Sequence, residues 1–169
     1  EKEVVADTTS YNSKETSVGL LIPVLNEIDG LKKLFPEIDK DIFDEILFVD
    51  GGSTDGTLEF LKENKCKVMN QKKAGLSEAV LEGINSMSVD CVVEFSPDGN
   101  CLPRYLPSVV KELKSGADLV VVSRYLPPAK SFDDTFITKI GNYTFTKLIN
   151  FFGKQKITDS LNIYRGFRV

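Results

Sequence analysis

Short runs of apolar residues alternate along this chain with segments whose apolar residues recur at helical spacing. The runs fit strands better than helices, because they are short and are bounded by glycine, proline or polar residues. Uniformly apolar strands that alternate with helices are typical of a parallel sheet covered on both faces. The pattern therefore predicts one α/β domain. The predicted strands are 18–22, 46–49, 66–69, 90–95 and 117–123, and the predicted helices begin near Asn26, Thr57, Leu76, Pro103 and Asp134.

The second predicted strand and the turn after it, residues 44–57, give the clearest local pattern. The run 46–49 ends in Asp50, and a turn with three glycines leads into a helix that begins at Thr57. Ligands of open α/β sheets bind outside the carboxyl ends of the strands, so Asp50 is expected at a ligand-binding edge and outside the core. Two interpretations are open: Asp50 and Asp55 bind a ligand, or Asp50 ends the strand and Asp55 caps the helix.

The residue types present exclude several well-known kinds of site. The sequence has neither the GxxxxGK[ST] pattern of P-loop nucleotide hydrolases nor the GxGxxG of dinucleotide-binding folds. It has no histidine, so no imidazole acts as a base or as a metal ligand. The three cysteines show no CxxC pairing, which indicates reduced thiols in the cytosol. A carboxylate at a strand end suits the ring N–H of a uracil or guanine base better than it suits a phosphate.

Polar groups follow three of the predicted strands, and basic residues stand near the same ends. The carboxyl ends of parallel strands meet at one edge of a sheet, so these residues are expected to converge. Carboxylates, amides and cations at one edge are what a diphosphate with its metal ion requires. Each residue alone has a structural explanation, but together they predict a sugar-nucleotide site. The polar groups are Asn26, Glu27, Asp50, Asp98 and Asn100, and the cations are Lys72, Lys73 and Arg124.

The two ends of the chain differ in character. Residues 1–16 are polar without periodicity and are predicted to be a flexible leader, which leaves 17–169 as the domain. The net charge of −4 is uneven, because residues 130–169 carry seven Lys and Arg against three Asp, or +4, and residues 1–129 therefore carry −8. No signal peptide and no apolar run of about 18 residues is present, so a cytoplasmic protein is expected. The lack of an initial Met and of an obvious last helix indicates a piece of a longer protein, truncated at its C-terminus.

The last predicted helix, from about Asp134 to Phe152, is apolar around more than half of its circumference. A surface helix of a globular protein needs an apolar stripe only somewhat wider than about 100°. A larger core, a second subunit or a membrane surface is expected to cover the rest. An uncovered face that contains Phe145 and Phe152, in the basic part of the chain, predicts contact with the cytoplasmic face of an anionic membrane or with a segment outside the given sequence. A homodimer interface or a larger core is the alternative.

Six short motifs follow one another between residues 22 and 168. They are IPVLNE at 22–27, VDGGSTDGT at 49–57, GLSEA at 75–79, PDGN at 97–100, SRY at 123–125 and GFR at 166–168. Over about residues 18–168 the chain thereby resembles the family 2 glycosyltransferases of GT-A fold, and among them the dolichyl- or polyprenyl-phosphate mannose synthases. The second motif and the order of the whole set are specific, whereas the shortest motifs alone are weak.

The resemblance implies a fold, an activity and partners. The fold is α/β of GT-A type, a mixed, mainly parallel sheet with helices on both faces. The activity is that of a glycosyltransferase, a hexosyltransferase that moves a sugar with inversion from a GDP- or UDP-sugar to a polyprenyl or dolichyl phosphate. An ionised phosphate acceptor needs no strong general base, which agrees with the absence of histidine. Nucleic acid is not expected as a partner.

Carried over residue by residue, the resemblance implies a donor site. Pro23 and Glu27 would line the ribose side, and Asp50 would bind the base. The other residues assigned to the donor site are Asp55, Lys72, Lys73 and Gly75.

The resemblance also implies how catalysis occurs. Asp98 would hold a divalent metal, Mg²⁺ or Mn²⁺, on the diphosphate, with Asn100 beside it. Arg124 and Lys139 would steer the acceptor phosphate. Catalysis would then consist of positioning and charge neutralisation.

One residue departs from the family pattern. The family usually has an Asp two positions before Asp98, and this sequence has Ser96. One carboxylate fewer predicts weak metal binding, and Glu94, on the same strand face as Ser96, is the candidate to compensate. Two alternatives to the lipid-phosphate transferase remain. One is a transferase to a sugar hydroxyl in surface polysaccharide synthesis, and the other, motivated by Ser96, is a sugar-nucleotide-binding module without turnover.

Overall fold

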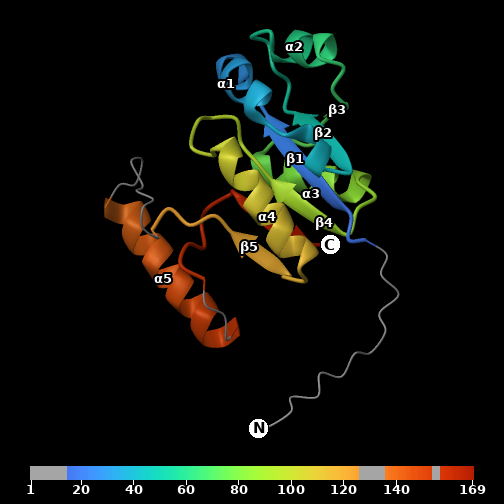
Figure 1. The fold of residues 1–169 in the computed structure, drawn as a ribbon. Helices are drawn as coiled ribbons and strands as arrows, with labels where there is room; N and C mark the ends of the chain where they lie inside the picture. Colours follow the sequence, from blue (N-terminus) through green and yellow to red (C-terminus); the bar gives the residue numbers. More distant parts are fainter. Residues whose placement is uncertain (1–14, 126–135, 154–156) are drawn as a thin grey trace.

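A computed structural model describes residues 15–125, 136–153 and 157–169 as an α/β fold built on one six-stranded sheet (Figure 1). The sheet order is β3-β2-β1-β4-β6-β5. The first four strands pair in parallel, and β6 runs antiparallel to both β4 and β5. The prediction of a mixed, mainly parallel sheet is confirmed. The strands are β1 (Val18–Val24), β2 (Glu45–Asp50), β3 (Val68–Asn70), β4 (Cys91–Glu94), β5 (Leu119–Val121) and β6 (Arg165–Arg168).

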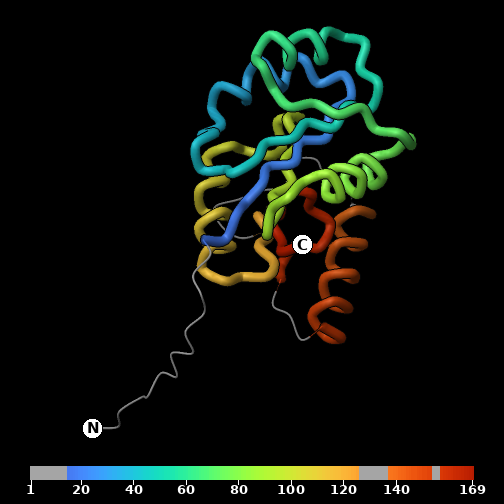
Figure 2. The backbone as a smooth tube through the Cα atoms, turned by 90° about the vertical axis from the view of Figure 1, so that its right-hand side faces the viewer, coloured from blue at the N-terminus to red at the C-terminus, as the bar shows by residue number. Residues whose placement is uncertain are grey.

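Helices cover both faces of the sheet, as predicted. One core cluster contains side chains of α1, α2 and α4, and the cluster on the opposite face contains those of α3. The backbone trace in Figure 2 shows these layers from the side. The predicted leader, apart from its last two residues, lies outside the described residues. The helices are α1 (Ile28–Leu34), α2 (Thr57–Glu63), α3 (Leu76–Ser86), α4 (Leu106–Lys114) and α5 (Phe136–Gly153), with 3-10 turns at Phe35–Glu37, Lys40–Ile42 and Pro103–Tyr105.

β1 is a central strand, and all of its residues are buried. Side chains of a strand alternate between the faces of the sheet, so Leu20 and Ile22 pack in the cluster under α1 and α4, whereas Leu21 packs against α3. A Cβ on Gly83 of α3 would lie 2.4 Å from the Leu21 side chain. Glycine at this position therefore lets α3 lie close to the sheet.

The C-terminal part of the sheet differs from the sequence-based prediction. β6 was not expected as a strand, because its residues include two arginines and no apolar run. Gly166 at its centre lies under α4, where a Cβ would be 2.7 Å from the Leu113 side chain. β6 lies between β4 and β5, so β5 is an edge strand. The predicted buried strand 117–123 is only three residues long, and its Leu119 is 46% exposed.

α5 confirms the predicted long helix and shows which side of it is buried. The buried side is polar, because Asn142 is 3% exposed and Thr146 is 9% exposed. α5 lies beside the segment that precedes β6, away from α1 and α2 (Figures 1 and 2). Among the described residues, no helix combines the length and apolar character needed to cross a membrane. The large apolar side chains of α5 that are exposed are Ile137, Ile140, Tyr143, Phe145, Leu148, Ile149, Phe151 and Phe152.

Candidate functional site

The turn after β2 and the start of α1 are joined by hydrogen bonds at the carboxyl edge of the sheet. The backbone amide of Asn26 donates to the Ser53 hydroxyl at 2.9 Å. The Asp55 carboxylate accepts from the amide of Ile28 at 3.1 Å and from the amide of Thr57 at 3.0 Å. Asp55 thus connects the start of α1 to the start of α2. Of the two interpretations of Asp55, ligand binding or a structural role, these hydrogen bonds support the structural role.

Asp50, at the end of β2, holds the same turn. Its carboxylate accepts hydrogen bonds from the backbone amides of Gly52 at 2.8 Å and Ser53 at 3.2 Å. The side chain is only 2% exposed. The prediction that Asp50 lies outside the core is therefore wrong, because the turn folds over its carboxylate. Its role in binding the donor base stays a prediction.

α1 lies directly against the loop that follows β4. A Cβ on Gly30 would be 1.9 Å from the carbonyl oxygen of Pro97, which leaves no room for a side chain. The same Cβ would be 3.6 Å from Oε2 of Glu27. The close contact holds Glu27, just before α1, near the loop that carries Asp98.

A hollow of about 330 Å³ lies at the carboxyl ends of β1, β2 and β4, and we call it the first hollow. Four of the predicted donor-site or metal-site residues line it, namely Pro23, Glu27, Gly75 and Asp98. Ser96 lines it too. Of the polar groups and cations that were predicted to converge at this edge, Glu27 and Asp98 line the first hollow. Residues that the sequence did not single out and that also line the first hollow are Val24, Leu25, Gln71, Ala79 and Ile163.

Two acids, Glu27 and Asp98, line the first hollow, and no Lys or Arg of the described residues lines it. Burial raises the pKa of Glu27, and the carboxylates of Asp98 and Asp55 raise it further. A cation placed between these groups would relieve the repulsion. The electrostatics of the first hollow therefore favour a positively charged ligand or a metal ion.

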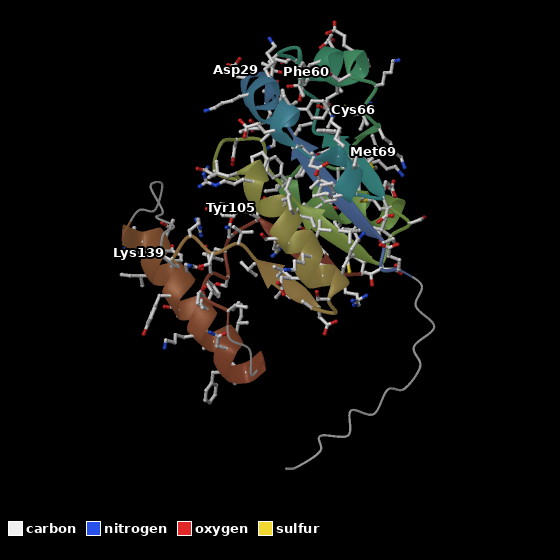
Figure 3. The ribbon with its side chains drawn as sticks, in the orientation of Figure 1. Asp29, Phe60, Cys66, Met69, Tyr105 and Lys139 are labelled. Atoms are coloured by element: carbon white, nitrogen blue, oxygen red, sulfur yellow. The ribbon has the colours of Figure 1, made fainter. Side chains whose placement is uncertain are left out.

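None of the four predicted cations, Lys72, Lys73, Arg124 and Lys139, lines the first hollow. The backbone amides of Lys72 and Lys73 donate to the Glu82 carboxylate at 2.8 and 3.1 Å, and neither lysine lines the first hollow. Glu82 holds this segment against α3 instead. Lys139 lies on an exposed part of α5, as Figure 3 shows, and it does not line the first hollow either.

Arg124 is held by a buried acid. Its Nε and Nη2 donate to the Asp159 carboxylate at 2.8 and 3.0 Å, and its backbone amide donates to the same carboxylate. Asp159 has no exposed surface, whereas the Arg124 side chain is 30% exposed. The guanidinium therefore has a fixed orientation near the carboxyl end of β5.

Asp98 and Asn100, the two predicted metal ligands, lie together in the loop after β4. The carboxylate of Asp98 accepts from the backbone amide of Asn100 at 2.9 Å, and both residues are exposed. Within the described residues, no three Cys, Asp or Glu side chains are grouped so that they could hold a metal ion. Mg²⁺ is commonly bound by one or two carboxylates together with substrate phosphates. Asp98 and Asn100 could supply the protein ligands of a metal ion of this kind.

Glu94, the candidate to replace the acid that is missing at Ser96, forms an ion pair with Arg165 instead. Glu94 is 1% exposed, and its Oε2 accepts from Nε of Arg165 at 3.0 Å. Burial raises the pKa of Glu94, and this effect outweighs the lowering by Arg165. Glu94 does not line the first hollow. The suggestion that Glu94 supplies the missing metal ligand is therefore wrong.

The thiols are not candidates for a nucleophile. All three cysteines are free, and Cys91 and Cys101 are buried. Burial raises the pKa of Cys101, next to the Asp98 loop, to about 12. A thiol with such a pKa stays protonated at neutral pH.

Comparison with models of protein families identifies the family of this chain. Residues 20–169 match the model for glycosyl transferase family 2. The chain belongs to this family. The resemblance first seen in six short motifs is confirmed, and the match spans the elements that line the first hollow.

Relatives of this chain include several that are named for lipid-phosphate acceptors. It is 32% identical over 131 residues to a dolichol-phosphate mannosyltransferase of Pyrococcus furiosus, which covers 73% of this chain and 37% of the relative. It is 29% identical to a polyprenol monophosphomannose synthase of Mycolicibacterium smegmatis, which covers 86% of this chain and 60% of the relative. The chain therefore spans about one third to two thirds of the length of these two relatives.

Solved structures support the fold. Glucosyl-3-phosphoglycerate synthase of Mycobacterium tuberculosis, in complex with Mn²⁺, UDP and glucosyl-3-phosphoglycerate, matches with a TM-score of 0.72 at 20% identity. The match covers 90% of this chain and 57% of that one. This likeness confirms the predicted GT-A fold.

Proposed function

We propose that this chain carries the donor-binding part of a glycosyltransferase, which moves a sugar from a nucleoside diphosphate to a polyprenyl or dolichyl phosphate with inversion. The observation that carries the proposal is the first hollow, where Pro23, Glu27, Gly75 and Asp98 meet at the carboxyl edge of the sheet. Family membership and the names of the relatives support the lipid-phosphate acceptor. The donor is a GDP- or UDP-sugar.

Asp98 and Asn100 would hold the divalent metal, which neutralises charge on the leaving diphosphate when it is bound. Pro23 and Glu27 would line the ribose side of the nucleotide. Asp50 would orient the turn that meets the base, since two amides of that turn already donate to its carboxylate.

The proposed reaction is a direct displacement. An oxygen of the acceptor phosphate forms a bond to the anomeric carbon of the sugar while the bond from that carbon to the diphosphate oxygen breaks. The bonding electrons leave with the nucleoside diphosphate, and the configuration at the carbon is inverted. The acceptor oxygen is already ionised at neutral pH, so no side chain has to remove a proton. Arg124, oriented by Asp159, would face the acceptor phosphate.

We propose that α5 rests on a membrane surface. A lipid-phosphate acceptor is itself held in a bilayer, and the exposed apolar side of α5 has the composition of a helix that lies in the interface. Lys139 and Lys147 are exposed on the same helix and would meet anionic headgroups. The competing occupant of this surface is a second copy of the chain.

Two alternative functions would use the first hollow as the same donor site. Transfer to a sugar hydroxyl needs a base. The raised pKa of Glu27, which lines the first hollow, is the observation in favour of this reading. A binding module without turnover is suggested by Ser96 in place of a second acid.

One assay separates the three functions. The protein is incubated with a radiolabelled GDP- or UDP-sugar, Mg²⁺ or Mn²⁺, and either undecaprenyl phosphate or a panel of free sugars. Label that moves into the organic phase with undecaprenyl phosphate supports the proposal. Label on a free sugar supports the polysaccharide alternative. Tight donor binding with neither product supports the binding module.

A further inference from the structure

A second hollow lies beside the first, between the start of α3 and the segment that leads into β6. Its volume is about 460 Å³. Leu76 and Ile163 line both hollows, so molecules bound in the two would meet at these side chains. A displacement reaction requires the acceptor oxygen within about 3–3.5 Å of the donor carbon. The second hollow is therefore placed where an acceptor has to lie if the first holds the donor.

Apolar side chains stand exposed around the second hollow. Leu76, Leu81 and Leu161 are 58%, 54% and 53% exposed, and all three line it. Apolar surface in water costs about 25 cal/mol per Å², and several such residues around one hollow mark a site that a ligand covers. The lining therefore fits a ligand with a hydrocarbon part.

A cation is held inside this apolar lining. The Nε of Arg165 donates to Oε2 of Glu94 at 3.0 Å, and Nη2 lies 3.5 Å from Oε1. Both residues line the second hollow, where Glu94 is 1% exposed and the side chain of Arg165 is 41% exposed. A guanidinium has five N–H donors, so it can bind a carboxylate on one edge and a phosphate on another. The buried Glu94 therefore orients Arg165 toward an anionic ligand.

The second hollow is connected to α5 by hydrogen bonds. Oδ1 of Asn142 accepts from the backbone amides of Ser160 and Leu161 at 3.0 and 3.1 Å, and from the Ser160 hydroxyl at 3.1 Å. Ser160 and Leu161 line the second hollow. The buried polar side of α5 thus fixes one wall of the hollow, while the apolar side of the helix is exposed next to it.

We propose that the second hollow is the acceptor site, in which Arg165 binds the phosphate head of an amphiphile and Leu76, Leu81 and Leu161 cover the first part of its hydrocarbon chain. This assignment rests on the proposed function, because it takes the first hollow as the donor site. Arg165 is then a second phosphate-binding cation besides Arg124.

Binding of citronellyl phosphate, a short polyprenyl phosphate, tests the assignment. Its affinity is measured by calorimetric titration with a saturating nucleoside diphosphate and Mg²⁺ present. We expect Leu81→Asp to weaken the binding at least tenfold, because an aspartate removes the apolar surface that the hydrocarbon chain would cover and places a charge there. Leu119→Asp is the matched control, because Leu119 on β5 is 46% exposed, close to the 54% of Leu81, and does not line the second hollow. It should leave the affinity unchanged.

Binding of the phosphate head by Arg165 is tested with a double variant that replaces the ion pair of Glu94 and Arg165 by two neutral side chains. In Glu94→Gln/Arg165→Gln the two amides can still bond, so the fold is not left with a buried unpaired charge. We expect this variant to lose at least tenfold in affinity for citronellyl phosphate, whereas Arg168→Gln, on the same strand, loses none.

A small phosphate ester is the other source of the same head group. In the parent protein 3-phosphoglycerate should bind at least tenfold more weakly than citronellyl phosphate, and Leu81→Asp should not affect it. Equal binding of the two ligands, or no effect of either hollow variant on citronellyl phosphate, would overturn the assignment. Failure of the parent to bind the nucleoside diphosphate counts against the proposed function. Unchanged affinity of both hollow variants for citronellyl phosphate, when the parent does bind the nucleotide, counts against the acceptor assignment alone.

Discussion

Gly30 offers a sharp test of how α1 positions the first hollow. In Gly30→Ala the new Cβ would lie 1.9 Å from the carbonyl oxygen of Pro97. A carbon and a carbonyl oxygen in contact lie about 3.3 Å apart, so α1 or the loop has to move by roughly 1.4 Å. Both groups belong to the backbone or are fixed to it, and neither can rotate away.

The magnitude follows from two opposing effects. Overpacking costs about 1–3 kcal/mol, with backbone overlap near the upper end, whereas alanine in place of glycine in a helix gains about 0.5–1 kcal/mol. We expect Gly30→Ala to lose about 2 kcal/mol, which lowers Tm by roughly 4–8 °C for a chain of this size. Movement of the loop that carries Asp98 by about 1 Å should also reduce turnover on the order of 100-fold.

Gly141→Ala is the matched control. Gly141 lies within α5, and a Cβ there would meet nothing within 4 Å. The same substitution should therefore raise Tm by roughly 2–4 °C and leave turnover unchanged. Differential scanning calorimetry and the transfer assay measure both effects. If Gly30→Ala is as stable and as active as Gly141→Ala, the contact between α1 and Pro97 does not position the site.

Three further predictions concern single side chains. Asp50→Ala should lower the free energy of unfolding in urea by about 1–3 kcal/mol, because the amides of Gly52 and Ser53 lose their acceptor; an unchanged value refutes its role in the turn. Glu27→Gln should raise Tm at pH 7 in the absence of metal, because the raised pKa of Glu27 means that its ionised form destabilises the fold. The gain should shrink as the pH falls and vanish below about pH 4, where glutamate is protonated in both states; a gain that is constant with pH contradicts this electrostatic cause. Phe145→Glu should reduce co-sedimentation with anionic vesicles at least tenfold, since a buried phenylalanine contributes about 1.5–3 kcal/mol, whereas Leu119→Glu should not. Loss of a concentration-dependent dimer on Phe145→Glu, with no vesicle binding by the parent, assigns this face to self-association instead.

The central strands and the hollow beside them were predictable from sequence because both follow from local pattern. Strands buried on both faces are apolar throughout, as β1 is, and parallel strands bring Pro23 and Asp98 to one edge. β6 was not predictable in this way, since Arg165, Gly166 and Arg168 give it no apolar run and its place depends on β4, far away in the sequence.

Side-chain pairing over long distances could not be predicted either. Glu94 and Arg165 are 71 residues apart, and only the antiparallel register of β4 and β6 places them opposite one another. Which side of α5 is covered could not be predicted either. Its apolar arc suggests burial, but Asn142 and Thr146 bond to the segment before β6, and their polar side is the one that is covered. Asn142, Thr146 and Asn150 recur at every fourth residue, but a polar stripe on a helix ordinarily predicts the side that faces solvent.

The affinity of the first hollow for a nucleoside diphosphate, with and without metal, tests the account most directly. Calorimetric titration of UDP and GDP is carried out with Mn²⁺ and with EDTA, on the parent and on Asp98→Ala. We predict that the parent binds one of the two at least tenfold more tightly with Mn²⁺, and that Asp98→Ala abolishes this difference while retaining the metal-free affinity. Binding by Asp98→Ala that equals the parent in Mn²⁺, or no binding of either nucleotide by the parent, would contradict the assignment of the first hollow as a donor site that works with a metal on Asp98.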